Sequence, residues 1–188
     1  MRHSLIVCHA ASFLLATGLF SASPSRASQT QSTQPDPETK LASLGIKLPA
    51  PTAPLANYVK SVRTGNLVFL AGHGPVKPNG DLVTGAVGRE LTIEQGYDAA
   101  RFAAIGLMTS LKAEIGDLRK VKRIVRLFGL VNCVDGFSEH SKVINGASDL
   151  LVEVFGDKGR HARAAVGAAS LPFNMAVEIE MIVDVSDD

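Results

Sequence analysis

The chain has 188 residues, with 19 Lys and Arg against 18 Asp and Glu, and its formal net charge is +1. This balance argues against a dedicated nucleic-acid binder, which usually carries a strongly basic face, and a hydrophobic content of 46% excludes wholesale disorder. With Cys8 and Cys133 as its two cysteines, the chain has neither a disulfide framework nor a cysteine-based structural zinc site.

Residues 1–27 have the pattern of an export signal peptide. A basic start precedes an apolar run from Leu5 to Phe20, and Ser25-Arg26-Ala27 places small residues where a signal peptidase reads them. The run is too short and too interrupted for a good membrane anchor. We therefore expect cleavage near Ala27 and an exported, periplasmic mature protein with no membrane segment. A cytosolic tail or an organellar transit peptide is the alternative interpretation.

Residues 28–54 are rich in Ser, Gln, Thr and Pro, a composition typical of a linker. We expect this segment to end by docking onto the folded domain around Leu41–Leu48, and we place that domain at residues 55–188. After cleavage near Ala27, Cys133 would be the single cysteine left, so no intrachain disulfide is expected.

The first half of the domain predicts two strands and a helix. Short apolar runs at 59–62 and 67–71, separated by a turn at Thr64-Gly65-Asn66, read as strands. Thr92 and Gln95 have the spacing of a capping box, which predicts that a helix begins at Thr92. Apolar residues then recur at helical spacing over 92–115.

The second half predicts a long strand at 121–131, a helix at 137–155, and strands at 162–170 and 177–185. This order favours an α+β fold in which a mixed β-sheet carries two helices packed on one face. The Ala- and Gly-rich strand 162–170 indicates close backbone approach, which is easier to explain inside an assembly than against water.

Familiar phosphate-binding and nucleophile motifs are missing from the sequence. It contains no Gly-Lys-Ser/Thr and no Gly-x-Ser-x-Gly. His73, His140 and His161 lack the spacing of metal ligands, so no metal is expected. Cys133 ends an apolar strand, which indicates a core residue rather than a nucleophile.

A few polar residues of the domain are candidates for chemistry. Arg163 opens a strand whose next same-face positions are small, which leaves room for an anion bound by two parallel hydrogen bonds. Glu178 and Glu180 share a face of the last strand, where a partly buried carboxylate could handle protons for a water. Tyr58 opens the first strand, and Asn145 lies mid-helix, where Asn is a poor helix former. For all of them an ordinary surface role is the alternative.

Three stretches of the chain resemble the RidA/YjgF proteins, the reactive-intermediate deaminase family. They are the glycine-rich stretch Tyr58 to Pro75, the helix Val143 to Leu151, and Gly159 to Glu180, which combines Arg163, a Leu-Pro and an acidic strand. The resemblance covers about residues 41–186. It implies a chorismate-mutase-like fold, a homotrimer with clefts between its subunits, and no metal or organic cofactor.

The resemblance also implies an activity, the hydrolysis of reactive enamines and imines such as 2-aminoacrylate and its imine to a 2-keto acid and ammonia. Arg163 matches the arginine that grips the substrate carboxylate. Glu178 matches the glutamate near the imine and its attacking water. Tyr58 and Asn145 match residues that line the cleft.

Three small residues lie around the implied pocket. Ala71 and Gly72 belong to the second strand, where many family members have Ser before the Gly. Ala165 follows the matched arginine by two residues, where many members have Cys. These two differences bear on substrate preference.

One geometric expectation follows from an assumed register. If strands 162–170 and 177–185 form a hairpin, Arg163 faces Asp184, and Glu178 lies roughly 20 Å away along the strand. One chain could not then place both groups on a three-carbon acid, whereas two neighbouring chains could. The functional alternatives are a non-catalytic module that binds small carboxylates and, less favoured, an endoribonuclease or a holdase.

Overall fold

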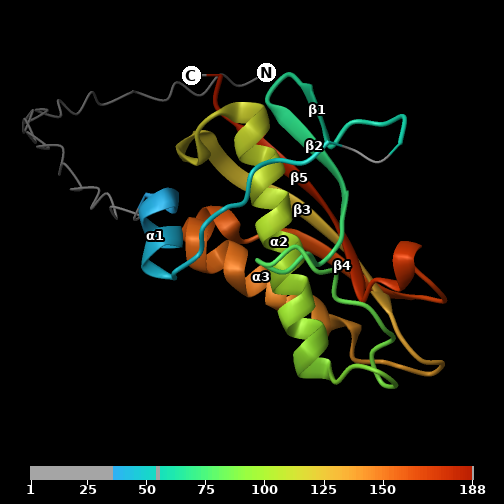
Figure 1. Cartoon of the computed structure of the whole chain (residues 1–188). Helices are drawn as coiled ribbons and strands as arrows, with labels where there is room; N and C mark the ends of the chain where they lie inside the picture. Colours follow the sequence, from blue (N-terminus) through green and yellow to red (C-terminus); the bar gives the residue numbers. More distant parts are fainter. Residues whose placement is uncertain (1–35, 54–55, 188) are drawn as a thin grey trace, which may run out of the picture. The chain divides into compact units, whose positions relative to one another are not determined.

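The computed structural model describes residues 36–53 and 56–187 (Figure 1). The signal peptide predicted over 1–27 and residues 28–35 of the predicted linker lie outside the described residues. Within the described part, the helices are too short or too polar for any of them to cross a bilayer.

The described residues form a mixed α+β fold with a five-stranded sheet. The helices are α1 (Pro37–Ser43), α2 (Ile93–Ile115) and α3 (His140–Phe155). The strands are β1 (Ser61–Thr64), β2 (Leu67–His73), β3 (Val121–Asn132), β4 (Ala162–Ala168) and β5 (Val177–Val185). Short 3-10 turns η1 (Leu118–Lys120), η2 (Gly156–Gly159) and η3 (Pro172–Asn174) connect them. The predicted order is confirmed from β1 to β5, although α3 begins three residues later than expected and β1 two residues later. Helix α1 was not predicted and lies in the segment expected to be a linker.

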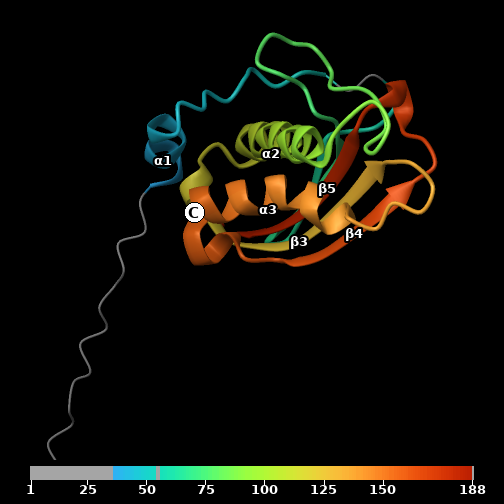
Figure 2. The same cartoon turned by 90° about the horizontal axis from the view of Figure 1, so that it is seen from below.

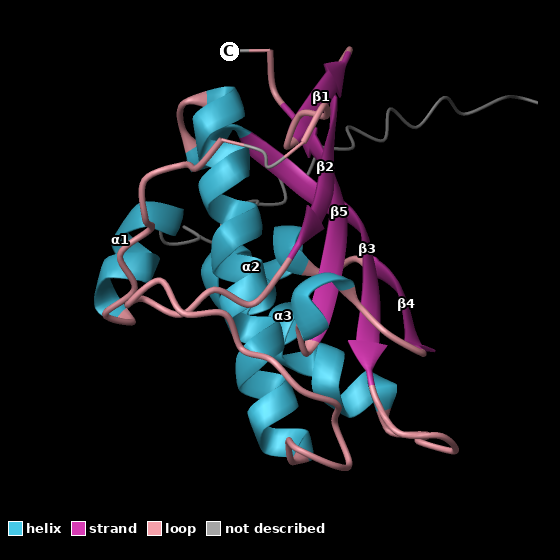
Figure 3. Cartoon of the chain, turned by 45° about the vertical axis from the view of Figure 1, so that its right-hand side comes forward, coloured by secondary structure: helices cyan, strands magenta, loops and turns pink. Residues whose placement is uncertain are grey.

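Helices α2 and α3 both cover one face of the sheet, as Figures 2 and 3 show. The predicted capping box at the start of α2 is present: the Thr92 hydroxyl accepts from the Gln95 amide, and the Gln95 side chain accepts from the Thr92 amide. The two helices touch closely because Gly146 of α3 lies against the Tyr97 carbonyl of α2, where a Cβ would overlap the oxygen.

Helix α1 and the segment after it dock onto the same layer. Leu41 is buried, and Leu44, Ile46 and Leu48 pack against the core. Glu38 of α1 forms a 2.8 Å ion pair with Lys112 of α2.

The strand order is β1-β2-β5-β3-β4, with β3 and β4 parallel and every other pair antiparallel. The expected hairpin between 162–170 and 177–185 is therefore wrong. Arg163 pairs with Leu127 of β3, and Asp184 pairs with Leu67 of β2 and Arg123 of β3. The physical reason is burial: β5 buries every second residue and fits an interior position, whereas the small, mostly exposed residues of β4 suit an edge.

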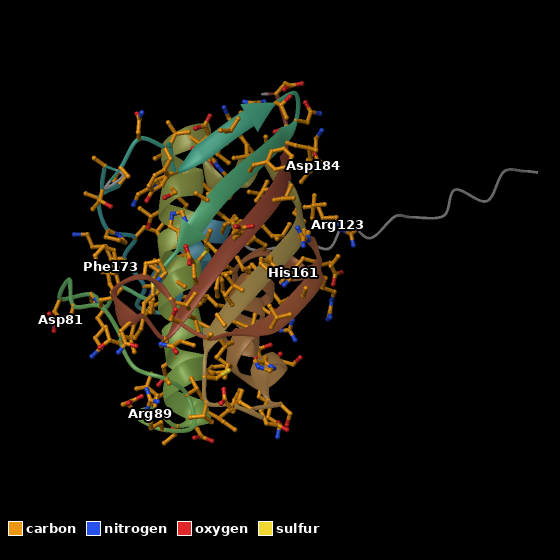
Figure 4. The ribbon with its side chains drawn as sticks, turned by 90° about the vertical axis from the view of Figure 1, so that its right-hand side faces the viewer. Asp81, Arg89, Arg123, His161, Phe173 and Asp184 are labelled. Atoms are coloured by element: carbon orange, nitrogen blue, oxygen red, sulfur yellow. The ribbon has the colours of Figure 1, made fainter. Side chains whose placement is uncertain are left out.

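Among the described residues, no helix lies over the opposite face of the sheet; Figure 4 views the strands in front of α2 and α3. Val62, Phe69 and Val166 are exposed there or along the edge strand. A hollow of about 420 Å³ lies over β1, β2, β3 and β5. Its lining includes Val62, Phe69, Ala71, Phe128, Glu180 and Ile182.

Candidate functional site

Arg163 lies on the edge strand β4 and reaches across to α3. Its Nη1 donates to Asn145 Oδ1 at 2.8 Å and to Ser148 Oγ at 3.0 Å. These two bonds use both hydrogens of Nη1. Among the residues that the structure describes, Nε and Nη2 donate to no other group. Nε and Nη2 share one edge of the guanidinium, the arrangement that matches the two oxygens of a carboxylate.

His161 contacts Ser148 on the side away from Arg163, and no prediction from the sequence included this contact. Its Nε2 is 3.1 Å from Ser148 Oγ, and its Nδ1 is 2.6 Å from the Gly159 carbonyl oxygen. Burial lowers the pKa of His161, and the charge of Arg163 lowers it further, whereas the bond to Gly159 raises it. Two features of the sequence could have indicated this group. His161 and Arg163 are two residues apart on one strand, and Asn145 and Ser148 are about one helical turn apart.

Glu178 lies on β5 and faces away from the helices. The odd-numbered residues of β5 are buried on the helix side, so the even-numbered ones point to the other face. The carboxylate rests against Gly72 of β2, where a Cβ would overlap Oε1. Burial raises the pKa of the Glu178 carboxyl, and the charge of Glu180 adds to the shift. A carboxyl with a raised pKa suits proton transfer at near-neutral pH.

The backbone beside Glu178 is fixed by a bulge in β2. The register with β5 shifts between Leu70 and His73. His73 Nδ1 is 2.7 Å from the Ala71 carbonyl oxygen, and its Nε2 is 2.7 Å from Ser110 Oγ on α2. Burial lowers the pKa of His73. The bulge thus brings Gly72 to the carboxylate, and Ala71 lines the hollow over the sheet.

Within one chain, Arg163 and Glu178 are kept apart. Arg163 aligns through Leu127 with Met181, and Glu178 pairs with Leu130. The two positions are thus three residues apart along the strands and two strands apart across them, or about 14 Å. Their side chains also point to opposite faces of the sheet. One chain therefore cannot place both side chains on a three-carbon acid. The assumed hairpin led to the same conclusion from a separation along the strands, whereas in the structure the two side chains also lie on opposite faces of the sheet.

The remaining predicted residues lie outside these two groups. Tyr58 precedes β1 and does not open it, contrary to expectation, and its side chain is exposed. Ala165 follows Arg163 on the same face of β4, pairs with Gly129 and packs against the core. The structure therefore contains two separate groups, one with Arg163 and Asn145 and one with Glu178 and Gly72. We call them the Arg163 half-site and the Glu178 half-site.

Metal ligands and a reactive thiol have little support in the described part of the chain. No group of three or more His, Cys, Asp or Glu side chains there is placed to hold a metal ion. Cys133 is half-buried, with its Sγ 3.5 Å from His140 Nε2. Burial raises the pKa of this thiol, which disfavours the reactive thiolate.

Comparison with known proteins identifies the fold. The family described as "YjgF/chorismate mutase-like, putative endoribonuclease" matches residues 38–185. The chain belongs to the YjgF/RidA family. Protein TCP17 of Trypanosoma cruzi is 46% identical over 145 residues, which cover 77% of this chain and 91% of that protein.

Solved structures of the YjgF/RidA family agree. A protein of unknown function from Agrobacterium tumefaciens is 44% identical with a TM-score of 0.73, covering 79% of this chain and 91% of its own. One from Shewanella oneidensis, called "a putative endoribonuclease", is 34% identical with a TM-score of 0.77, covering 80% and 99%. The resemblance carried by Arg163, the Leu-Pro and the acidic strand is thus confirmed at the level of the family.

Proposed function

We propose that the protein hydrolyses reactive enamine and imine intermediates of the 2-aminoacrylate type to 2-keto acids and ammonia. The observation that carries this proposal is the geometry at Arg163. Its Nη1 is held by Asn145 and Ser148, so that the Nε–Nη2 edge can receive both oxygens of a small carboxylate. Membership of the YjgF/RidA family supports the same assignment.

We further propose that the working site forms between subunits of a homotrimer. Arg163 and Glu178 point to opposite faces of one sheet, so the glutamate that meets a bound acid would come from a neighbouring copy. The face of the sheet opposite α2 and α3 exposes Val62 and Phe69 and carries the hollow of about 420 Å³. Apolar surface of this kind is typical of protein–protein contact.

The chemistry needs only positioning and one proton carrier. Arg163 holds the carboxylate and draws electron density away from the imine carbon. The Glu178 carboxylate accepts a proton as water adds to that carbon. That proton passes to the nitrogen, which gives a carbinolamine. Glu178 then takes the hydroxyl proton and delivers it to the same nitrogen, so that the carbon–oxygen double bond forms as the carbon–nitrogen bond breaks, and ammonia and the 2-keto acid leave. Water supplies the oxygen of the product, and no electron donor or acceptor is required.

The test is ammonia and 2-keto acid release from freshly generated imino acids, with wild type, Arg163→Ala and Arg163→Lys side by side. We expect Arg163→Ala to lose at least about 100-fold in kcat/KM, because two charge-assisted hydrogen bonds disappear. Arg163→Lys keeps the charge and loses the fork, and we expect about a tenfold loss. A full deaminase rate in Arg163→Ala would overturn the assignment.

The same experiment separates the rival functions. A non-catalytic carboxylate-binding module would be stabilised thermally by pyruvate and release no ammonia. Because the family and one relative are named for endoribonuclease activity, an RNA substrate belongs in the panel. Cleavage of RNA without ammonia release would replace the deaminase proposal.

A further inference from the structure

Behind Arg163 lies an ordered chain of hydrogen bonds whose direction can be assigned. The Gly159 carbonyl oxygen can only accept, so His161 Nδ1 must carry a hydrogen and donate to it across 2.6 Å. In a neutral imidazole, Nε2 then has a lone pair and accepts from the Ser148 hydroxyl at 3.1 Å. The Ser148 oxygen is left to accept from Arg163 Nη1 at 3.0 Å.

The surroundings of His161 keep this direction. The ring is partly buried between α3 and the start of β4, and the cation of Arg163 acts on it. Both features disfavour a second proton on the ring. With His161 neutral, the Ser148 hydroxyl hydrogen points away from the guanidinium and its lone pairs point toward it.

Ser148 and Asn145 act together on one nitrogen. They lie three residues apart on α3, so both project from the same face of the helix. Each takes one hydrogen of Arg163 Nη1. Two acceptors on a rigid helix fix the plane of a guanidinium that is otherwise on an exposed strand and free to rotate.

We propose that Ser148 and His161 are positioning residues that orient Arg163 so that its Nε–Nη2 edge meets the substrate carboxylate. This inference rests on the proposed function only in taking a carboxylate as the ligand. His161 acts through Ser148, and Ser148 acts through Arg163, and neither touches the reacting atoms. Losing either leaves the charge in place and removes the preorganisation of the fork.

The experiment measures two quantities on the full chain: the Kd for pyruvate by calorimetry, and KM and kcat for imine hydrolysis. The variants are Ser148→Ala, Ser148→Thr and His161→Phe. We expect Ser148→Ala to weaken pyruvate binding and raise KM about tenfold, with kcat within about twofold. Ser148→Thr retains a hydroxyl and restores most of the affinity. His161→Phe keeps a ring but frees the hydroxyl to rotate, and it raises Kd several-fold.

Two further serines serve as controls. Ser141→Ala makes the same change on an exposed position of α3 and should alter neither Kd nor Tm. Ser110→Ala removes the buried partner of His73 and should lower Tm without weakening pyruvate binding. A Ser148→Ala variant that unfolds is recognised by its Tm, and Ser148→Thr and His161→Phe then carry the test through their Kd values.

The outcomes distinguish this inference from the deaminase proposal. Wild-type affinity for pyruvate in both Ser148→Ala and His161→Phe overturns the positioning role. So does a wild type that fails to bind pyruvate at all. Absence of ammonia release by wild type, with pyruvate binding that still depends on Arg163 and Ser148, overturns the deaminase and leaves the positioning role supported.

Discussion

His73 and His161 have the same local arrangement at two places in the fold. Each ring donates from Nδ1 to the carbonyl two residues earlier and is bonded at Nε2 to a serine of a helix. The hydrogen bonds from His73 end at Ser110, which is only 5% exposed. Those from His161 continue through Ser148 to the exposed Arg163.

The role of each histidine therefore depends on the residue that its series of hydrogen bonds reaches. The first histidine holds a strand bulge in the interior, beside Gly72 and Glu178. The second holds a cation at the edge of the sheet. Changes around His73 should therefore appear mainly as stability, and changes around His161 mainly as ligand affinity.

The largest effect on stability is expected at the contact between α2 and α3, because α3 carries the Asn145 and Ser148 side chains that hold Arg163. A Cβ at Gly146 would lie 2.8 Å from the Tyr97 carbonyl carbon and overlap the oxygen, and backbone cannot yield as a side chain can. We expect Gly146→Ala to lower the free energy of unfolding by about 3 kcal/mol or more in urea denaturation.

Gly106→Ala is the matched control for that change, on the His73 side of α2. Its Cβ would meet His73 Cδ2 at 3.4 Å, an ordinary contact, and Ala favours a helix over Gly by up to about 1 kcal/mol. We expect no loss of stability. Equal stabilities of the Gly146 and Gly106 variants would contradict the claim that α2 and α3 need the bare glycine.

The Glu178 half-site can be displaced without disturbing the fold. A Cβ at Gly72 would lie 2.8 Å from Glu178 Cδ and overlap Oε1, and the flexible side chain can move away. We expect Gly72→Ala to reduce kcat about 10- to 100-fold with little change in Tm. Gly74→Ala crowds Met175 Sδ at 2.5 Å instead and should retain much more activity. An equal loss in both variants would indicate a general distortion of β2.

The two histidines should also make the protein less stable in acid. Because the pKa of His73 is lowered in the folded state, the unfolded chain binds more protons below about pH 6.5. Its contribution to stability is complete above that pH and is lost as the pH falls through the folded pKa. The contribution of His161 depends on pH in the same direction, because its pKa is also lowered. Glu178 has the opposite sign, because its pKa is raised and its folded form keeps the proton.

We therefore expect Tm to fall between pH 7.5 and pH 5, and His73→Asn to make that fall shallower. The measurement is a thermal unfolding series over pH for wild type and variant. An identical slope in His73→Asn would show that this buried ring is not among the groups that set the pH dependence.

The smallest effect is expected at Phe173, which belongs to neither half-site. Its φ is 54° and its side chain is 72% exposed, a conformation that costs a non-glycine residue about 1–2 kcal/mol. We expect Phe173→Gly to raise stability by roughly 0.5–1 kcal/mol after the entropy cost of glycine. Asn174→Gly, also at φ 54°, should not stabilise, because it loses the bond from Asn132. A lower Tm for Phe173→Gly would contradict the prediction and indicate that the ring packs against another copy.

Local signals in the sequence determined much of this protein. The capping box at Thr92 fixed the start of α2, and the alternation over 177–185 fixed which face of β5 is buried. Residue type and neighbours made Arg163 and Glu178 candidates, and the family resemblance gave them their proposed roles. Such signals suffice because capping and periodicity act over a few residues, and the chain needs no partner segment to express them.

Only the tertiary structure decided where those elements lie. The hairpin expected after 162–170 failed because strand pairing is non-local and depends on which strands must be buried on the helix side. That pairing put Arg163 and Glu178 on opposite faces of the sheet. It also brought Ser148 of α3 against His161 and Arg163, a contact between residues 13 and 15 positions apart that no single segment encodes, because it forms only when α3 packs beside β4.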